Sequence, residues 1–374
     1  MKRTISIKLL TTKEQDSLLS ELQTLFAKTC NTVVPFAVDN HCTNAVKLHH
    51  LAYYAVREEV PSIGSQMVCN SIRKVSTSYK SLATNRKLSK KDKFPIISFS
   101  AKTSIHFDKK SYTFKDNAIS LFTTQGRIIV PMKIGKFQQN YLDIGKNKEA
   151  ELVNKKKGWF FNLVIDIEDF PLVQTQTVIG VDVGENNLAA TSSGLLFGGG
   201  KLRHERQKYL QLRKRLQSNG SKSAKRKLKK ISGKESRHIK DVNHVVSKSI
   251  VLEAINKNCS HIILENLTNI RNNIKASKKV RARLHGWAFR QLQDFITYKA
   301  QEKGIQTEYI NPAYTSQTCA VCGNKGVRDK HKFSCNLCGR LAHSDLNASQ
   351  NIASLGYSIL FPTATVNLPN VATS

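Results

Sequence analysis

The sequence predicts an α+β protein of several domains, in which a small β-barrel carrying a helical insert precedes an α/β region. Residues 3–9 alternate apolar and polar side chains, as a half-buried strand does, and strands of this period resume only near residue 96. Apolar residues at helical spacing fill the interval between them. From about residue 177 the apolar runs become nearly continuous, which is typical of strands buried on both faces.

The composition indicates a folded and strongly basic protein. The chain has 374 residues with 40% hydrophobic content, which is enough for more than one core. Its 59 Lys and Arg residues against 27 Asp and Glu residues give a formal net charge of +32. This charge exceeds what solubility requires and predicts a polyanionic partner, with nucleic acid as the leading candidate. A basic membrane-surface protein is the alternative, but no apolar run is long enough to span a bilayer and the first residues lack a signal-peptide core, so we expect no membrane partner.

The first half of the chain is expected to hold a strand, three helices and five further strands, in that order. Thr11 and Glu14 follow the first strand in a capping-box pattern. Helical spacing then covers residues 12–34, 44–60 and 62–82. The segments "SIHF", "YTF", "AIS", "RIIV" and "WFFNLVI" are short strands separated by turn-like sequences.

A second α/β region is expected from the strand "VIGVDVG", its hairpin partner "LAATSSGLLFGG" and the strand "HIILENL" at 261–267. Between them, residues 201–240 contain 16 Lys and Arg residues but only Glu205 and Glu235 as acids, which predicts a basic helical hairpin turning near "SNGS". Most such runs are solvated charged faces, and the imbalance of sign favours nucleic-acid contact here. The candidate contacts are Arg213, Lys214, Arg226 and Lys227.

Two Cys-x-x-Cys pairs, Cys319 with Cys322 and Cys335 with Cys338, are separated by twelve residues. Two such pairs can close a tetrahedron of thiolates around one Zn²⁺, and a site filled by four sulfurs leaves no position for a catalytic water. The pattern therefore predicts a structural zinc, with a pair of redox dithiols as the alternative. The remaining cysteines lack motif spacing and indicate reduced thiols, so we expect an intracellular, cytoplasmic protein, nucleoid-associated in a prokaryote.

Three carboxylates form a second candidate site. Asp182 and Glu265 end apolar strands, and Asp345 opens a helix seven residues after Cys338. Each of these acids, taken singly, is most simply explained as a helix cap or a turn residue. Acids within apolar strands are costly unless they are paired or bind metal, so together the three predict a site for two Mg²⁺ ions that act on a phosphodiester.

In order and spacing, "GVDVGENNLAATSSG", "ILENLTNI", "NPAYTSQTCAVCG" and "HSDLNASQNIA" resemble the RuvC motifs and inserted zinc ribbon of the TnpB family. These are transposon-encoded, RNA-guided nucleases related to the type V CRISPR effectors. The N-terminal stretch "HHLAYYAVREEVPSIGSQ" resembles the same family, so the likeness covers nearly the whole chain. Many relatives have an acid where this chain has His343, a departure that leaves Asp345 unaffected.

The resemblance implies an RNase H-like (RuvC) α/β nuclease domain with an inserted zinc ribbon and a wedge β-barrel carrying a helical recognition insert. It implies cleavage of target DNA directed by a guide RNA, with contacts to both double-stranded and single-stranded DNA. Asp182, Glu265 and Asp345 match the catalytic D-E-D, which takes Mg²⁺ or Mn²⁺, and the four cysteines match the zinc ligands. The expected domains are 1–10 (first barrel strand), 11–92 (recognition), 93–173 (remaining barrel) and 174–374 (nuclease), the last with a basic helical segment 201–257 and a ribbon 314–341.

Three other functions fit parts of the sequence. A nuclease-inactive, RNA-guided DNA-binding repressor would have no use for an intact set of three acids. A non-catalytic zinc-ribbon regulator explains the cysteines and the charge but leaves Asp182 and Glu265 unused. A DNA transposase is disfavoured because the motifs resemble RuvC.

The helix expected over residues 63–82 is also a candidate DNA contact. Its apolar positions recur roughly at heptad spacing, which predicts one face packed on the helical core. The opposite stripe is polar, and Gln and Asn side chains can pair with adenine while Arg and Lys contact the backbone. An ordinary solvated face is the alternative. The stripe consists of Gln66, Asn70, Arg73 and Lys80.

Overall fold

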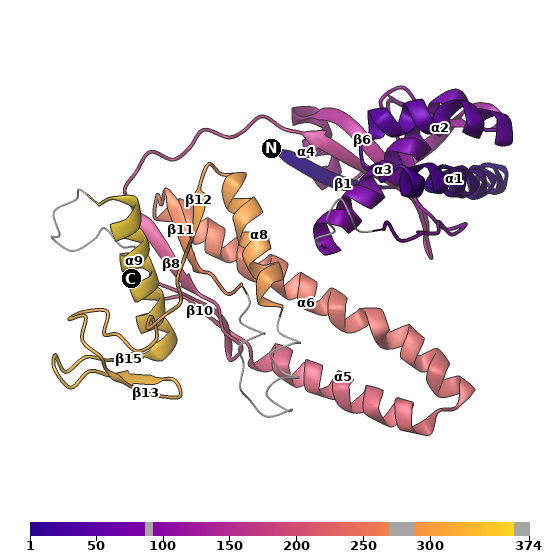
Figure 1. The fold of residues 1–374 in the computed structure, drawn as a ribbon. Coiled ribbons are helices and arrows are strands. Elements are labelled where there is room, and N and C mark those ends of the chain that lie inside the picture. Colours follow the sequence, from indigo (N-terminus) through magenta and orange to yellow (C-terminus); the bar gives the residue numbers. More distant parts are fainter. Residues whose placement is uncertain (87–92, 269–287, 363–374) are drawn as a thin grey trace. The chain divides into compact units, whose positions relative to one another are not determined.

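The computed structural model describes residues 1–86, 93–268 and 288–362, and the chain divides into two compact units (Figure 1). The first unit is Met1–Glu168 and the second is Asp169–Ser374. Each unit has its own sheet and its own buried apolar core, so they are described separately. Within the described ranges, no helix combines the length and the apolar character that crossing a bilayer requires.

The described part of the first unit is built on a seven-stranded antiparallel sheet with the strand order β2-β6-β7-β1-β5-β4-β3. The strands are β1 (Lys2–Leu9), β2 (Ile105–Phe107), β3 (Tyr112–Lys115), β4 (Ala118–Thr123), β5 (Gly126–Lys133), β6 (Lys146–Lys155) and β7 (Gly158–Asp166). The apolar side chains of β1 that alternate in the sequence, Ile5, Ile7 and Leu9, are all buried. β1 lies between β7 and β5, although these strands follow it by more than a hundred residues.

The sheet is nearly closed. Its two edges, β2 and β3, are joined by residues 108–111. At the start of β3 the Tyr112 hydroxyl donates to the Lys148 carbonyl over 2.7 Å, which links the edge strand β3 to β6, the neighbour of the other edge strand. Tyr112 also packs edge-on against Phe161 of β7. The barrel expected from the sequence is therefore a curled sheet with one open seam.

Three helices separate β1 from β2, as the sequence predicts. They are α1 (Lys13–Asp39), α2 (Ala45–Glu59) and α3 (Ser65–Arg86). The expected capping box was wrong by one residue, because Thr12 and Gln15 make the reciprocal cap bonds. The expected end at residue 34 was also wrong, since α1 continues through Pro35. A proline in a helix loses a hydrogen bond, and here the burial of Val33, Val34 and Ala37 around it offsets that loss.

Two elements of the first unit were not anticipated, namely β6 and the short helix α4 (Lys136–Ile144). In β6 only Ala150 and Leu152 are buried, so charged side chains on the exposed face hide its period in the sequence. None of the α4 side chains is fully buried. Neither element therefore leaves a clear hydrophobic pattern.

In the second unit the described residues form a five-stranded sheet in the order β10-β9-β8-β11-β12. The strands are β8 (Val178–Asp182), β9 (Asn187–Thr191), β10 (Leu196–Gly198), β11 (His261–Glu265) and β12 (Gln306–Ile310). β8, β11 and β12 are parallel to one another, whereas β9 and β10 run antiparallel. The predicted strands and hairpin are confirmed, and β12 was not anticipated.

Helices cover both faces of this sheet. The helices are α5 (Gly200–Asn219), α6 (Lys222–Asn256), α8 (Phe289–Gln301) and α9 (Ser344–Leu360). Ile179 and Ile262 share a buried cluster with residues of α6 and α8, whereas Val178 and Ile263 point the other way and pack with Ile352 of α9. This alternation along β8 and β11 places α9 against one face, where Figure 1 shows it in yellow.

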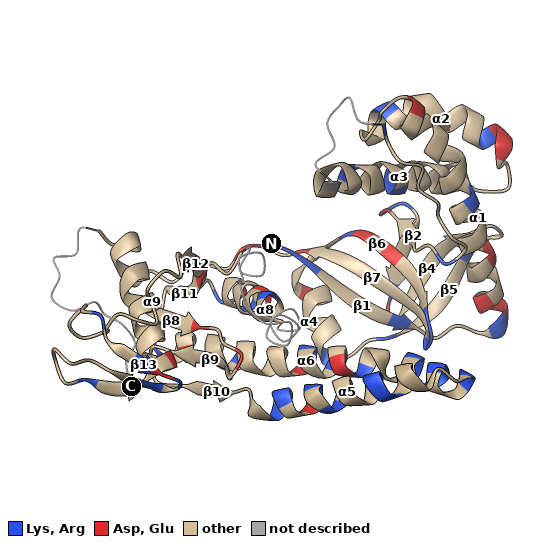
Figure 2. Cartoon of the chain, turned by 60° about the horizontal axis from the view of Figure 1, so that its bottom comes forward, with Lys and Arg blue, Asp and Glu red and all other residues tan. Residues whose placement is uncertain are grey.

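The predicted basic hairpin is confirmed as α5 and α6. The turn between them contains Gly220 in the left-handed region at φ 63°, followed by Ser221, whose hydroxyl caps α6. Figure 2 shows Lys and Arg residues along both helices.

Candidate active site

Asp182 and Glu265 lie side by side at the ends of neighbouring parallel strands. Val181 pairs with Leu264 in the register of β8 and β11, so the next residue of each strand is an acid. The carboxyl ends of parallel strands are the edge at which open α/β sheets bind ligands. Strand register therefore brings together two acids that are 83 positions apart in the sequence.

Asp345 reaches the same edge because α9 packs very closely on the sheet. A Cβ atom added to Gly180 of β8 would lie 2.2 Å from the Ser349 carbonyl oxygen and 2.5 Å from the Ala353 nitrogen. A Cβ atom added to Gly356 would lie 2.5 Å from the Ile263 side chain. Only glycine allows this approach at either position. The first turn of α9, which carries Asp345, is thereby held next to the strand ends.

The three carboxylates influence one another electrostatically. Burial, followed by the charges of Glu265 and Asp345, raises the pKa of Asp182 to about 8, against the opposing effect of Arg328. Burial also raises the pKa of Glu265, while a hydrogen bond from Thr315 and the charge of Arg328 act in the opposite direction. Asp182 as a whole residue is half-buried. Such a group of acids favours a bound cation.

Other side chains hold these acids in place. Asn187 of β9 donates to Asp345 Oδ2 over 2.9 Å, and Arg328 donates to Asp345 Oδ1 over 3.0 Å. Thr315 donates to Glu265 Oε1 over 2.6 Å. Sequence reasoning missed Asn187, Thr315 and Arg328 as site residues. Asn187 and Thr315 lie inside quoted motifs, whereas Arg328 has no sequence signal because only tertiary folding brings it to Asp345.

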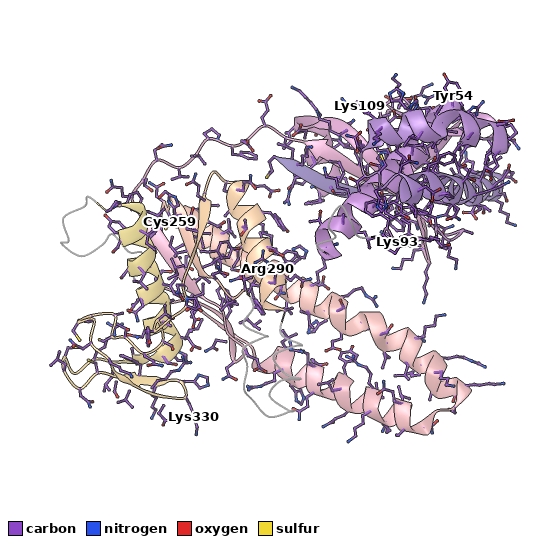
Figure 3. All side chains as sticks on the ribbon, in the orientation of Figure 1. Tyr54, Lys93, Lys109, Cys259, Arg290 and Lys330 are labelled. Carbon is purple, nitrogen blue, oxygen red and sulfur yellow. The ribbon has the colours of Figure 1, made fainter. Side chains whose placement is uncertain are left out.

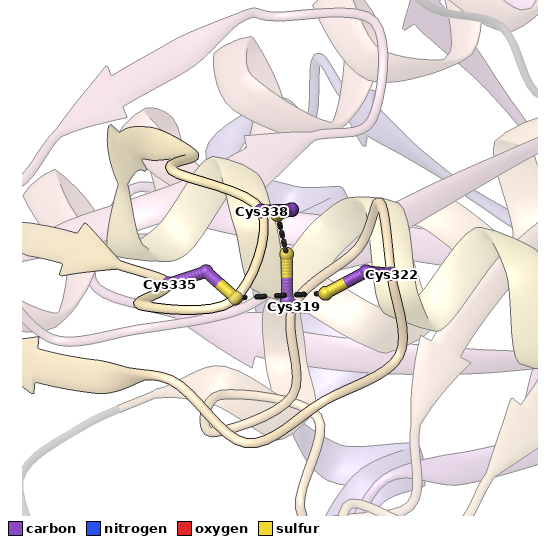
Figure 4. Close-up of side chains that lie close together, drawn as sticks. All are labelled: Cys319, Cys322, Cys335 and Cys338. Carbon is purple, nitrogen blue, oxygen red and sulfur yellow. Dashed lines mark hydrogen bonds between the residues drawn. The ribbon is translucent and has the colours of Figure 1, made fainter.

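The four cysteines form a compact sulfur cluster (Figure 4). Cys319 Sγ lies 3.6 Å from Cys338 Sγ, and Cys322 Sγ lies 3.5 Å from Cys335 Sγ. A tetrahedral zinc site with bonds near 2.3 Å has sulfur separations of about 3.8 Å. The donor set therefore fits Zn²⁺. A backbone hydrogen bond at Asn324 lowers the pKa of Cys322, whereas the neighbouring thiols raise the pKa of Cys338, so the cluster loses its first proton at Cys322.

A small three-stranded sheet carries part of this cluster and leads directly into α9. Its strands are β13 (Val327–Asp329), β14 (Lys332–Ser334) and β15 (Leu341–His343). Two buried amides of α9 bond to the segment before the first cysteine pair. Asn347 donates to the Thr318 carbonyl over 2.7 Å, and Asn351 donates to the Thr315 carbonyl over 2.7 Å. The cysteine cluster and the helix that carries Asp345 are thus one connected structure.

The polar stripe predicted on α3 is not a continuous exposed face. Asn70 is only 1% exposed and donates to Ser111 Oγ, so its assignment as a base-reading surface residue was wrong. The opposite side of α3 contacts β2 and its following turn, which covers part of the stripe. Gln66 donates to Asp108 Oδ2 over 2.6 Å, and Arg73 pairs with Glu149 over 2.7 Å. Lys80 is exposed.

The four candidates on the basic hairpin differ in their surroundings. Arg213 of α5 forms an ion pair with Glu235 of α6, and Arg206 also lies 3.6 Å from that carboxylate. Lys214, Arg226 and Lys227 are exposed. Arg213 therefore serves at least partly to join the two helices, and the exposed three are the better candidates for contact with a polyanion.

The architecture and site can be compared with known proteins. A family model described as "Cas12f1-like, TNB domain" matches residues 289–352, and one described as "Probable transposase" matches residues 162–271. A TnpB-like protein of Methanocaldococcus jannaschii is 30% identical over 260 residues, which cover 64% of this chain and 91% of that protein. The chain belongs to the TnpB family.

Other relatives of this TnpB family member are named as nucleases. A CRISPR-associated endodeoxyribonuclease Cas12f1 of Sulfoacidibacillus thermotolerans is 31% identical over 221 residues, covering 54% of this chain and 51% of that protein. The putative RNA-guided DNA endonuclease InsQ of Escherichia coli is 26% identical, with 65% of each chain covered. The fold resembles Cas12f1 in a complex with sgRNA and target DNA, with a TM-score of 0.65, 16% identity and coverage of 92% of this chain and 83% of that one.

Proposed function

We propose that this TnpB family protein is an RNA-guided DNA endonuclease that cleaves target DNA at a RuvC-like site formed by Asp182, Glu265 and Asp345. The observation that carries the proposal is the convergence of these three acids at one edge of the second sheet. On this reading the second unit is the RNase H-like nuclease domain, residues 314–341 are its zinc ribbon, and the first unit is a wedge barrel with a recognition insert at residues 11–92.

Divalent metal suits this group of acids. Three neighbouring carboxylates, two of them with a raised pKa, supply hard oxygen ligands whose mutual repulsion a cation relieves. Mg²⁺ or Mn²⁺, when bound there, would polarise the phosphodiester and activate the attacking water. The four cysteines are the corresponding soft donor set for a structural Zn²⁺.

The chain's own residues prepare the site for this chemistry. The Thr315 hydroxyl and the Asn187 amide fix the orientation of Glu265 and Asp345 by donating to one carboxylate oxygen of each. The second oxygen of Glu265 remains available as a metal ligand, and the second oxygen of Asp345 can exchange its bond with Arg328 for a metal ion. Arg328 is 39% exposed in its side chain, so its guanidinium can bond Asp345 and also face an incoming phosphate.

Nucleic acid is the partner class that the charge favours. A formal charge of +32 supplies the backbone neutralisation on which RNA and DNA affinity largely depends. Relatives are named as RNA-guided endonucleases, and the structural neighbour holds an sgRNA and target DNA. We assign a guide RNA, together with double-stranded and single-stranded DNA, to this chain on the same grounds. A protein with these partners acts inside the cell.

A plasmid cleavage assay tests the proposal. The protein would be purified with its co-expressed RNA and incubated with Mg²⁺ and a plasmid library that carries the matching target beside randomised flanks. Wild type is expected to cut, whereas Asp182→Ala, Glu265→Ala and Asp345→Ala each abolish cutting and keep bound RNA, because affinity is spread over many Lys and Arg residues. Wild-type-like cutting by any one variant would remove that residue from the site. Bound RNA without cutting by wild type would favour a guided repressor, and absence of RNA a zinc-ribbon regulator.

A further inference from the structure

Two histidines stand beside the carboxylate cluster and have no part in the chemistry proposed above. His331, His343 and Asp345 each offer one ligand atom, and these three atoms lie within 4.8 Å of one another. His331 is exposed and follows Lys330, which Figure 3 labels on the small cysteine-bearing sheet. His343 ends β15 and is half-buried, and Asp345 is 7% exposed. The group therefore opens to solvent on one side.

The fold fixes this arrangement through backbone pairing. β14 and β15 run antiparallel with Lys332 opposite His343, so His331 lies one position beyond the end of the paired strand. The Ser344 amide donates to the His331 carbonyl over 2.9 Å, which ties this residue to the start of α9. The two imidazole rings stack with their centroids 5.4 Å apart and an angle of 26° between them. Both rings are thereby presented to the same carboxylate.

Two imidazoles and one carboxylate are the ligands of a borderline transition metal. Imidazole nitrogen suits Zn²⁺, Co²⁺, Ni²⁺ and Fe²⁺, whereas Mg²⁺ prefers oxygen ligands alone. Around a tetrahedral ion with bonds near 2.1 Å, ligand atoms lie about 3.4 Å apart. The ligand atoms, which lie within 4.8 Å of one another, therefore have to close by up to about 1.4 Å to reach tetrahedral spacing, and a rotation of the exposed His331 side chain can supply this movement.

We propose that His331, His343 and Asp345 form a further metal site for Zn²⁺ or a similar transition-metal ion, and that an ion there withdraws Asp345 from the neighbouring carboxylate cluster. The first half of this proposal is independent of nuclease activity. The second half rests on the proposed function, because it gives Asp345 two competing uses. Transition metal would then act as a negative regulator of the Mg²⁺-dependent site.

Local contacts predict a weaker site than the four-cysteine cluster. The Asp345 backbone amide donates to His343 Nδ1 over 3.2 Å, and binding through either ring nitrogen gives up this cap bond, because it changes which nitrogen carries the proton. The positive charges of Arg328 and Lys330 also oppose a further cation. The site should therefore fill only when free transition metal is raised, while the cysteines hold zinc throughout.

A Co²⁺ titration tests the site directly. Full-length protein with zinc already in the cysteine cluster would be titrated without Mg²⁺, following the visible absorption of Co²⁺ bound to nitrogen and oxygen. Wild type should bind one Co²⁺ with nitrogen ligands beyond its zinc, distinguished by its absorption from any Co²⁺ bound by carboxylates alone. Loss of even an outer-shell partner weakens metal sites 10-fold or more, so His331→Ala and His343→Asn should each weaken binding at least about ten-fold. His343→Asn keeps an acceptor for the helix cap, and His204→Ala, an exposed histidine of α5, is the matched control.

A second measurement tests the withdrawal of Asp345 without relying on cleavage. Mn²⁺ bound at the carboxylate cluster would be followed by electron paramagnetic resonance while buffered Zn²⁺ is added. Zn²⁺ should release Mn²⁺ from wild type at a lower concentration than from His331→Ala. Equal release from both proteins would overturn the competition, and no Co²⁺ bound beyond zinc, or equal Co²⁺ binding by wild type and both ligand variants, would overturn the site. Failure of plasmid cleavage would count against the nuclease alone.

Discussion

Asp182 is a carboxylate held where a negative charge is unfavourable. Its pKa of about 8 lies above the ordinary value of 3.8, so between these limits the folded, metal-free protein keeps a proton that the unfolded chain releases. The stability that this difference contributes is fully present below pH 3.8 and is lost as the pH rises toward 8. Without Mg²⁺ or Mn²⁺, the second unit should therefore become less stable as the pH rises from 3.8 toward 8.

Replacing this carboxylate should remove that pH dependence. Without Mg²⁺, we expect Asp182→Asn to melt about 5 °C or more above wild type at pH 8, because 1 kcal/mol corresponds to roughly 2–4 °C for a unit of this size. The difference in melting temperature should narrow as the pH falls toward 5.5. Calorimetry of both proteins at several pH values, with zinc retained, measures the effect. Mg²⁺ should raise the melting temperature of wild type more than that of the variant. Parallel pH profiles would show that Asp182 is not strained in the free protein.

Arg328 acts on all three acids of the cluster. It bonds Asp345 and lowers the pKa of both Asp182 and Glu265, so it partly fills the role of a cation when metal is absent. We expect Arg328→Ala to bind Mg²⁺ more tightly and yet to cleave at least about ten-fold more slowly, because a charge-assisted contact worth roughly 1.5–3 kcal/mol is lost. Mg²⁺ titrations of cleavage rate separate the two effects.

Arg328→Lys is the matched control for this variant. It keeps the charge without the planar donor pair, so it should retain near-normal Mg²⁺ dependence with an intermediate rate. A fall in rate accompanied by weaker Mg²⁺ binding in Arg328→Ala would instead mean that Arg328 merely supports the fold of the site.

At the scale of elements, the contact between α9 and β8 decides where Asp345 lies. Gly180→Ala would push a methyl group against two backbone atoms of α9, so the helix must shift. We expect a loss of about 1–3 kcal/mol in stability, as for other overpacked cores, together with loss of cleavage. Denaturant unfolding and the plasmid assay measure these. Gly198→Ala is the matched control, because an added Cβ there meets no atom within 4 Å. Equal behaviour of the two variants would contradict this account of how α9 is positioned.

At the scale of the whole molecule, metal at the cysteines should control cleavage without controlling RNA affinity. Chelating zinc removes the structure that joins Cys319 and its neighbours to α9 through Asn347, so Asp345 loses its support. Binding of the proposed guide RNA would depend on charge spread over the entire chain and should persist.

We expect zinc-free protein to cleave at least about ten-fold more slowly, since weakening the support of a metal ligand costs 10–100-fold. Zinc content, RNA retention and cleavage would be measured on the same samples. Cys335→Ser should reproduce the effect, whereas Cys69→Ser, which changes a thiol of α3 outside the cluster, should not. Full cleavage by protein shown to lack zinc would contradict the structural role.

Much of the fold and of the candidate site is encoded locally, which is why the sequence alone predicts it. Three features depend only on residues close together in the sequence. They are the alternation in β1, the continuous apolar strands β8 and β11, and the basic hairpin. The spacing of the cysteines restricts them to one small loop pair, so their clustering follows from chain geometry. Asp182, Glu265 and Asp345 were candidates from the sequence because acids in apolar strands are costly unless they are paired or bind metal, and the strand register places the first two side by side.

Only the tertiary structure decided which side chains surround these acids and which polar residues are hidden. Arg328 reaches Asp345, and Thr315 reaches Glu265, through pairings between distant segments that no local pattern records. Asn70 looked like a surface residue and is buried, because α3 packs on two sides at once. The physical reason is the same in each case. A periodicity shows that a face is apolar or polar, but the packing partner, which depends on the whole chain, determines what that face meets.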